Sequence, residues 1–337
     1  MQKKERNSNI EALRVFMMFL IILLHFSARV YDLKDTDNYP AFTFSILQSI
    51  RSFCFLGVST FAFISGYYGI NWSLNKFLKL EFLAISWGVG IYIVGALMGG
   101  MPSPKILFPL CSGYIWYFSA YMILMILSPI INTGIKNVEK KTHQTIVIFL
   151  VCFFYGGQFI FPDSIGQNFL ILVVIYILAS YLHKYPNQNL EKNALYYFLL
   201  AVLLNATIAF TASNYLDHTA NNLPSKLFSK FATNNNPLVI FASINLFLFT
   251  KNLKKHPFKF LSKLAPYMLA TYIIHGFILS MQKVENFLHK ESLLFLIFSS
   301  ILALIVCSIL EKIRQLLTGK LENNIINHLT KQDQQIN

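Results

Sequence analysis

Charged residues are scarce in this chain of 337 residues: Asp, Glu, Lys and Arg together make up only 13% of it. Soluble domains carry about twice that fraction. The scarcity excludes an ordinary soluble domain, and the 55% hydrophobic content and mean hydropathy of +0.51 agree with this. Apolar runs of membrane-spanning length recur from end to end, and they are too long for the tilted strands of a membrane barrel. The sequence therefore predicts an all-α, polytopic bundle of membrane helices.

Cysteine is also rare, with four residues in the whole chain. They are Cys54, Cys111, Cys152 and Cys307. Their positions are far apart and show no metal-ligand spacing. We expect them to be small apolar residues of the membrane helices, and we predict no metal site.

Acidic residues number 15 against 28 Lys and Arg, which gives a net charge of +13. A basic chain can indicate nucleic-acid binding, but here the cations fall in short loops between apolar segments rather than in one stripe. Loops of that kind follow the positive-inside rule of membrane proteins. We therefore exclude nucleic acid as a partner and expect the chain to contact membrane lipid.

The apolar runs predict ten membrane spans. If both termini lie on one side, that side holds 19 of the 28 cations and the opposite loops hold six. This bias predicts that both termini are cytoplasmic. The basic N-terminal arm superficially resembles a signal peptide, but no clean cleavage site follows it, so we expect a retained first helix. The predicted spans are at about 10–31, 43–68, 81–100, 113–133, 145–161, 168–183, 194–213, 236–250, 264–282 and 292–312.

The predicted outer loops leave no room for a second soluble domain. Only the loop at about 214–235 is long, and the first outer loop is acidic because it carries Asp32, Asp35 and Asp37. We expect residues 1–337 to form a single transmembrane domain. Residues 313–337 are expected to be a polar cytoplasmic tail that can extend the last helix.

The first span carries two polar side chains that are costly in lipid. Arg14 stands near its start, His25 lies deep inside it, and the ten residues between them are uncharged. In a helix, eleven steps of 1.5 Å place the two residues about 16 Å apart along the axis, roughly half the hydrocarbon thickness. Ionisable side chains inside a membrane mark a functional site by default. The alternative for Arg14, near the cytoplasmic end of the predicted span, is that it snorkels to the lipid headgroups. We take Arg14 and His25 as the candidate catalytic pair.

Other polar residues fall within the predicted spans. His275 suits a hydrogen bond between helices, and Asn205 and Asn245 are expected to bridge helices in the same way. For Arg51 a structural ion pair or polar network is as good an interpretation as a catalytic one. The six remaining histidines fall in loops or at span ends, where we expect them to be solvated; they are His143, His183, His218, His256, His289 and His328.

Two lysines stand at the cytoplasmic end of the predicted third span. Lys76 and Lys79 are three residues apart and therefore share a helix face. One interpretation is simple positive-inside anchoring. The other is a binding site for the phosphates of a cytosolic cofactor, because ammonium groups pair with phosphates as point charges.

These features together resemble acyltransferase family 3, the bacterial transmembrane O-acyltransferases. The first span carries the family's signature of Arg, ten residues and His, at Arg14 and His25. The second span ends FAFISGYYGI, which is similar to the family's aromatic-rich Ser-Gly-Tyr ending. Where the family often has an Arg-x-x-Arg pair, this chain has Lys76 and Lys79, which keep the charge but lose the bidentate fork. The residues of the Ser-Gly-Tyr ending are Ser65, Gly66 and Tyr67.

Two later stretches extend the resemblance from the first span to the ninth. GYIWYFSAYMILMILSPIIN is similar to the family's Trp-Tyr-Leu stretch with its Ser-Pro ending, and TYIIHGFIL to its late Tyr-x-x-His stretch. The matching residues are Trp116, Tyr117, Ser128, Pro129, Tyr272 and His275. Some family members append an extracellular hydrolase-like domain, whereas this sequence shows none.

The resemblance implies transfer of an acyl group, most often acetyl, from a cytosolic thioester such as acetyl-CoA. The acceptor is usually a hydroxyl of a surface polysaccharide or of its lipid-linked glycan precursor, at a bacterial plasma membrane. His25 would deprotonate that hydroxyl or briefly carry the acyl group, because a neutral imidazole is a suitable base. Arg14 would orient the donor, and Lys76 and Lys79 would hold its nucleotide end.

Two other functions are alternatives to an acyltransferase. A transporter or flippase of an anionic glycolipid would use Arg14 and Arg51 as substrate ligands. Such proteins usually show internal repeats and matched Gly- or Pro-broken spans, and neither is clear here. A polysaccharide polymerase would be expected to carry larger outer loops rich in Arg and His, whereas the longest one here holds His218 and no Arg.

Overall fold

The computed structural model describes residues 7–30, 41–97, 103–160, 167–215, 236–254, 259–279 and 293–336. In these ranges the chain is helical and contains no strand, so the predicted all-α class is confirmed. The helices that follow the predicted spans are α1 (Ser8–Val30), α2 (Ala41–Cys54), α3 (Leu56–Tyr68), α4 (Leu74–Leu97), α6 (Trp116–Asn137), α7 (Lys140–Ile160), α8 (Gln167–Lys184), α10 (Ala194–Tyr215), α12 (Pro237–Asn252), α14 (Met268–Leu279) and α16 (Leu293–Ile336). Short connecting helices are η2 (Pro104–Leu107), α5 (Pro109–Ser112), α9 (Gln188–Lys192), α13 (Lys259–Leu264) and η3 (Ala265–Tyr267).

Helices occur at all ten predicted span positions. Six helical segments in the described part of the chain are long and apolar enough to cross a membrane, and two shorter apolar helices cover 169–184 and 237–252. The protein is therefore a multi-pass membrane protein, while the count of ten crossings stays a prediction. Asp32, Asp35 and Asp37 of the first outer loop, and residues 216–235 of the long one, lie outside the described residues.

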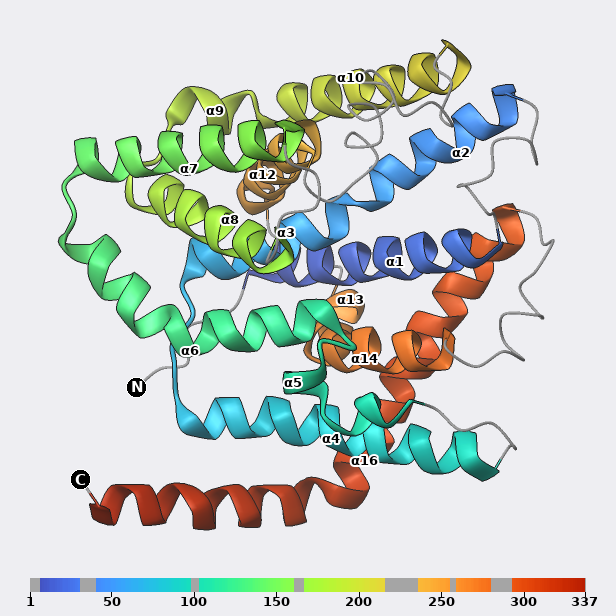
Figure 1. Ribbon diagram of the computed structural model, residues 1–337, viewed down its shortest axis with the longest axis vertical. Coiled ribbons are helices and arrows are strands. Elements are labelled where there is room, and N and C mark those ends of the chain that lie inside the picture. The colour runs from blue at the N-terminus through green and yellow to red at the C-terminus, as the bar shows by residue number, and fades with distance from the viewer. Residues whose placement is uncertain are drawn as a thin grey trace.

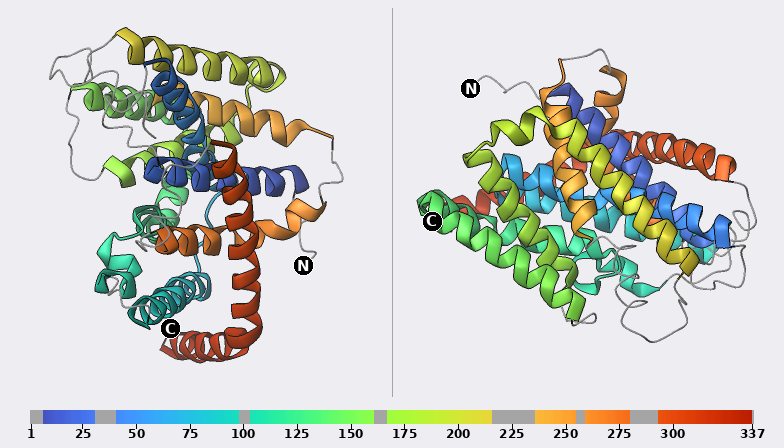
Figure 2. Two further views of the ribbon diagram at one scale, coloured as in Figure 1. Left: turned by 90° about the vertical axis from the view of Figure 1, so that its right-hand side faces the viewer. Right: turned by 90° about the horizontal axis from the view of Figure 1, so that it is seen from above.

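α1 lies in the middle of the bundle. Figures 1 and 2 show it among α2, α3, α12, α14 and α16, and it contacts all of them. Its run from Val15 to Phe26 is apolar almost all round, which is the pattern of a helix buried on every side. Met17, Met18 and Ile22 are accordingly among the most buried side chains of the protein. The central position of α1 places its side chains in contact with several of the helices that could build a site.

Two predicted spans depart from simple rods. The second is divided at Phe55 into α2 and α3, and the fourth, α6, continues past Pro129 to Asn137. Figure 1 shows α6 bent along its length. A proline inside a helix removes one backbone hydrogen bond and commonly causes such a bend.

Gly66 allows α3 and α8 to pack at close range. A Cβ atom at this position would lie 2.7 Å from both the Cα atom and the carbonyl oxygen of Tyr176, and 2.9 Å from the Cβ atom of Ala179. Two of these atoms belong to the backbone and cannot swing away. The Ser-Gly-Tyr ending therefore contains glycine for a packing reason.

Replacement of Gly66 by Ala is expected to lower the stability of the protein by about 1–3 kcal/mol, because overpacking forces the two helices apart. Thermal unfolding of the detergent-solubilised protein measures the effect. Gly90→Ala in α4 is the matched control, since a Cβ there meets no atom within 4 Å. Equal melting temperatures for the two variants would show that the close contact does not matter.

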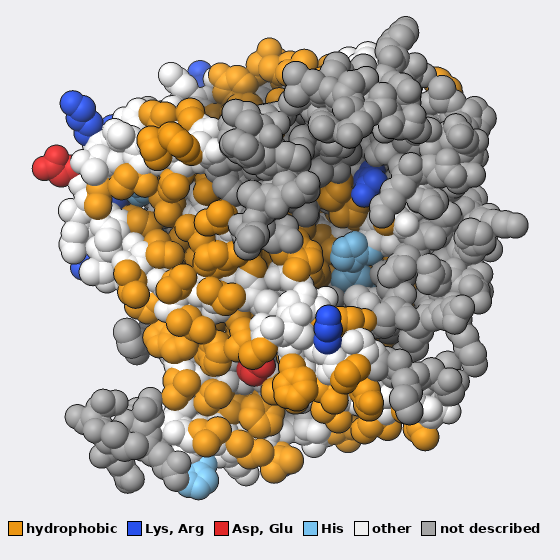
Figure 3. Space-filling view, viewed as in Figure 1, with side chains coloured by type: hydrophobic (Ala, Val, Ile, Leu, Met, Phe, Trp, Pro, Cys, Tyr) orange, Lys and Arg blue, Asp and Glu red, His pale blue; other side chains and the backbone are white. Residues whose placement is uncertain are grey.

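The described outer surface is dominated by apolar side chains, as a lipid-facing surface requires. Figure 3 shows hydrophobic side chains over most of the described part of one face, with few charged ones among them. Large exposed residues of this kind include Ile130, Phe153, Leu203, Leu294 and Phe298. In water so much exposed apolar surface would be unstable, whereas in a bilayer it is solvated by acyl chains.

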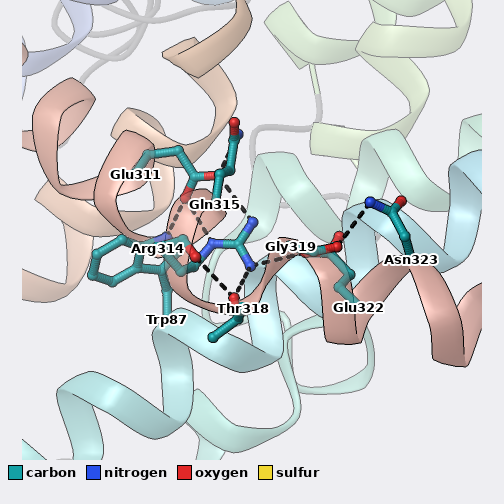
Figure 4. Close-up of polar contacts among 8 residues, drawn as sticks. All are labelled: Trp87, Glu311, Arg314, Gln315, Thr318, Gly319, Glu322 and Asn323. Carbon is teal, nitrogen blue, oxygen red and sulfur yellow. Dashed lines mark hydrogen bonds and ion pairs between the residues drawn. The ribbon is translucent and has the colours of Figure 1, made fainter.

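The last helix runs through the residues that were predicted to form a polar tail. α16 is 44 residues long, and Figure 1 shows that its second half turns away from the first and runs beside α4. A polar cluster lies where α16 contacts α4, and Figure 4 shows its contacts. Arg314 pairs with Glu311 and Glu322, and the indole of Trp87 in α4 donates to Glu311 over 2.8 Å. The Trp87–Glu311 hydrogen bond thus joins α16 to α4, and Arg314 links Glu311 and Glu322 within α16.

One histidine was predicted wrongly. His143 was expected to be solvated near the end of a span, but its side chain is buried at 1% exposure. Its ring lies edge-on to Tyr181 of α8, with the ring centroids 5.1 Å apart. The local pattern placed it correctly near the start of α7, but it did not show that α8 covers this turn.

Candidate functional site

A cavity of about 250 Å³ opens between α1, α3, α4, α6 and the stretch from η3 to α14. Its wall is mostly apolar and aromatic, with Arg14 and Ser65 among its few polar residues. The lining residues are Arg14, Met18, Ile21, Phe61, Ile64, Ser65, Leu80, Tyr117, Tyr121, Ala265, Pro266, Met268, Leu269 and Tyr272. A concave apolar site with a few convergent polar groups is the usual form of a ligand pocket.

Arg14 supplies the cavity's charge. Its side chain is 31% exposed, and its Nη1 atom lies 3.6 Å from Oε1 of Glu11, three residues earlier on α1. Glu11 is buried, and its carboxylate lies in the first turn of α1, where the helix dipole favours an anion. The predicted topology puts this end of α1 at the cytoplasmic side. That topology, which stays a prediction, would let an anionic ligand from the cytosol meet the guanidinium.

Tyrosines form one wall of the cavity. The rings of Tyr117 and Tyr121 are stacked one helical turn apart with centroids 6.4 Å from each other. Tyr272 of α14 meets Tyr117 edge-on at 5.6 Å. Aromatic rings lose little conformational entropy on binding and present both apolar and polar edges. Such a wall suits a slender organic ligand that carries scattered polar groups.

His25 lies behind this wall and does not itself line the cavity. Its Nδ1 atom is 2.8 Å from Nε2 of His275, and the two rings are nearly parallel, with an angle of 15° between them. His275 also contacts Tyr272, a lining residue, with ring centroids 5.7 Å apart. The structure thus connects both ends of the Arg14–His25 segment to one region, with Arg14 in the cavity and His25 one residue layer away.

The three residues of the Ser-Gly-Tyr ending have different neighbours. Ser65 lines the cavity and donates its hydroxyl to the carbonyl of Phe61 in its own helix. Gly66 packs against α8, as described above. Tyr67 accepts a 3.1 Å hydrogen bond from Nζ of Lys251, which is also paired with Glu191 at 2.7 Å. The stretch therefore joins the cavity to α9 and to the C-terminal end of α12.

The remaining predicted site residues are not among the lining residues. Trp116 packs edge-on against Tyr117, with ring centroids 5.6 Å apart. Lys76 and Lys79 are exposed in the first two turns of α4, and Lys76 lies one turn before the lining residue Leu80. Arg51 stacks over Phe55 at 5.7 Å, and its Nε atom has no hydrogen-bond partner in the described part of the chain.

The two bridging asparagines behave differently from each other. Asn205 of α10 accepts a hydrogen bond from the Asn236 side chain at the start of α12, so it does bridge helices. Asn245 donates to the carbonyl of Phe241 in its own helix, 2.8 Å away. Asn245 therefore makes its hydrogen bond within α12, and its side-chain oxygen has no partner in the described part of the chain. The predicted bridge between helices was wrong for Asn245.

Several residues of the site were not singled out in the sequence. Glu11 could have been found by its spacing of three residues from Arg14, and Tyr121 by its spacing of four from Tyr117, because such pairs share a helix face. Phe61 likewise stands four residues before Ser65, whereas Pro266 carries no such signal. In the described ranges no three His, Cys, Asp or Glu residues gather in a way that could hold a metal ion.

Comparison with known protein families identifies the family of the chain. The profile described as an acyltransferase domain, that of acyltransferase family 3, matches residues 7–312. The match covers every helix that contributes to the cavity, together with His25 and His275. Neither a curated protein nor a solved structure matches the chain. The chain therefore belongs to acyltransferase family 3 and is a membrane acyltransferase.

Proposed function

We propose that the protein transfers an acetyl group from cytosolic acetyl-CoA to a hydroxyl of a cell-surface polysaccharide or of its lipid-linked glycan precursor, at a bacterial plasma membrane. One observation carries the proposal. Arg14 lines a cavity, and Tyr272, which lines the same cavity, contacts His275 of the His275–His25 pair. A cation for the donor and an imidazole base are thus held about 16 Å apart along one helix axis.

The cavity suits the slender end of the donor. Its volume of about 250 Å³ is smaller than most pockets for drug-sized ligands, so it can hold a short acyl thioester and part of the arm behind it, but not a whole CoA molecule. The nucleotide end would remain at the cytoplasmic mouth. Lys76 and Lys79 are exposed four residues and one residue before Leu80, and their ammonium groups would pair with its phosphates there.

His25 acts on the acceptor in this proposal. As a general base it would take the proton of the sugar hydroxyl while the oxygen attacks the thioester carbonyl. The carbon–sulfur bond then breaks, the CoA thiolate leaves, and the proton passes from the imidazolium to the sulfur. The products are the O-acetylated sugar and free CoA thiol, and His25 is regenerated.

A covalent route would use the same residue differently. His25 would attack the thioester itself and carry the acetyl group before the sugar accepts it. Labelled acetyl-CoA supplied without acceptor separates the two routes. A base leaves the protein unlabelled, whereas a carrier yields up to one labelled acetyl group per chain.

Arg14 is tested by its effect on donor binding. Arg14→Ala is expected to raise KM for acetyl-CoA by about 10-fold or more, because a charge-assisted hydrogen bond contributes about 1.5–3 kcal/mol. The KM of Arg14→Lys should fall between those of the wild type and Arg14→Ala, since lysine keeps the charge and loses the bidentate geometry of the guanidinium. Release of CoA thiol by the purified protein in the presence of acceptor gives both constants.

The control for this measurement is Lys254→Ala, which removes an exposed cation that does not line the cavity. It should leave KM unchanged. Equal KM values for Arg14→Ala and the control would remove Arg14 from donor binding. A transporter, flippase or polymerase of lipid-linked glycans would release no thiol from acetyl-CoA even in the wild-type protein, and that result would overturn the proposed function as a whole.

A further inference from the structure

The side chains of His25 and His275 are hydrogen-bonded to each other, and His275 is also hydrogen-bonded to the backbone. His275 is only 2% exposed, and its two ring nitrogens have different partners. Its Nδ1 atom lies 2.9 Å from the carbonyl oxygen of Thr271, one turn earlier on α14, and its Nε2 atom lies 2.8 Å from Nδ1 of His25. These two hydrogen bonds connect a main-chain carbonyl of α14 to the candidate base on α1. His25 and His275 are 250 residues apart in sequence.

The direction of each hydrogen bond follows from the carbonyl. A carbonyl oxygen can only accept, so the bond to Thr271 requires a proton on Nδ1 of His275. A buried charge is costly, which favours a neutral His275, and a neutral imidazole carries one proton. Its Nε2 atom is therefore the acceptor, and Nδ1 of His25 is the donor. In neutral His25 the lone pair then belongs to Nε2.

We infer that His275 is a positioning residue that fixes His25 in the tautomer with its proton on Nδ1, so that Nε2 of His25 is the nitrogen that takes the acceptor's proton. The inference rests on the proposed function for its chemical meaning. The hydroxyl O–H bond breaks and an N–H bond forms at Nε2 of His25. The imidazolium that results keeps its Nδ1–H bonded to His275, and a charge-assisted bond of this kind is stronger than the neutral one.

The same arrangement explains how the base recovers. When the thiolate leaves, it takes the proton from Nε2, and His25 returns to the Nδ1–H tautomer because His275 still presents an acceptor there. The contact with Thr271 stays closed throughout, so His275 gives up no proton. His275 thus orients the base and does not exchange a proton with the substrate.

Two variants of His275 separate positioning from packing. In His275→Gln the side-chain oxygen can accept from His25 while the amide NH₂ donates to Thr271, so most activity should remain. In His275→Leu the acceptor for Nδ1 of His25 is lost, so His275 no longer fixes the tautomer and orientation of that ring, and kcat should fall by about 10²-fold with KM for acetyl-CoA unchanged. Ile274→Ala, at a fully buried neighbouring position of α14, controls for lost packing.

The expected order of kcat is therefore wild type, Gln variant, then Leu variant, with the Ile274→Ala control close to the wild type. Gln and Leu variants that fall equally, or a Leu variant with unchanged kcat, would overturn the inference. Acceptor-dependent thiol release by the wild type shows independently that the proposed function holds.

The tautomer can also be read without any turnover. Nitrogen-15 NMR of histidine-labelled protein in detergent distinguishes protonated from unprotonated ring nitrogens, and the difference from His25→Ala protein assigns the signals of His25. We expect a protonated Nδ1 and an unprotonated Nε2 near neutral pH, with the preference lost in His275→Leu. A protonated Nε2 and bare Nδ1 in the wild type would contradict the inference, whether or not the protein proves to be the proposed enzyme.

Discussion

Replacement of His25 by Ala is expected to lower kcat for acetyl transfer by about 10²–10⁴-fold, the usual contribution of a positioned general base. KM for acetyl-CoA should change little, because Arg14 and the cavity wall that would bind the donor are untouched. Single-turnover and steady-state measurements of CoA thiol release, with acceptor in excess, give both constants. The effect is large because His25 is the proposed base, and its neighbour His275 is hydrogen-bonded on both ring nitrogens.

The matched control is His328→Ala, which removes an exposed histidine from the second half of α16. It should retain wild-type kcat. Chromatographic profiles of both variants must match that of the wild type, so that loss of rate is not loss of folding. A His25→Ala protein with normal kcat would exclude this residue both as base and as acyl carrier.

Replacement of Arg314 by Leu is expected to destabilise the protein by about 3–5 kcal/mol, the usual result of breaking a buried ion pair from one side. Arg314 donates to both oxygens of Glu311, from Nε and from Nη2, each over 2.9 Å. Its Nη1 atom lies 3.1 Å from Glu322. Without the guanidinium two carboxylates would share a poorly solvated site, where the Glu311 side chain is only 2% exposed.

The double variant Glu311→Gln with Arg314→Leu tests this explanation. It removes the unpaired charge, and an amide oxygen at position 311 can still accept from the indole of Trp87. We therefore expect it to recover a substantial part of the lost stability. Thermal unfolding of the two detergent-solubilised variants and the wild type measures this recovery. If the single and double variants melt at the same temperature, the unpaired Glu311 charge is not the cause of the lost stability.

Some of the site could be predicted because it lies within single helices. Arg14 and His25 share one apolar run, and the 3.6-residue repeat alone gives their separation along the axis. The stretches that contain Ser65, Tyr117 and Tyr272 were picked out by the family resemblance, and the structure brings all three to the wall of one cavity. Their convergence could not be derived from spacing, because it depends on how three separate helices pack.

The parts that sequence reasoning missed depend on contacts between distant helices. No local pattern pairs Trp87 with Glu311, and an indole in an apolar run is usually only a packing residue. His143 was placed at a span end by its hydrophobic neighbours, but the burial comes from Tyr181 on another helix. Gly66 shows the same limit, since only the packed structure reveals that Tyr176 lies against it.

In the proposed reaction Arg14 serves the donor and His25 serves the acceptor, at the two ends of one segment of α1. Proteoliposomes with the protein in one orientation test it most directly, with labelled acetyl-CoA on the cytoplasmic side and the glycan acceptor on the other. We predict labelled O-acetyl glycan in equal amount to the free CoA thiol, and none when acetyl-CoA is supplied on the outer side alone. Labelled glycan formed only when donor and acceptor share one side, or glycan movement without any thiol release, would contradict the account.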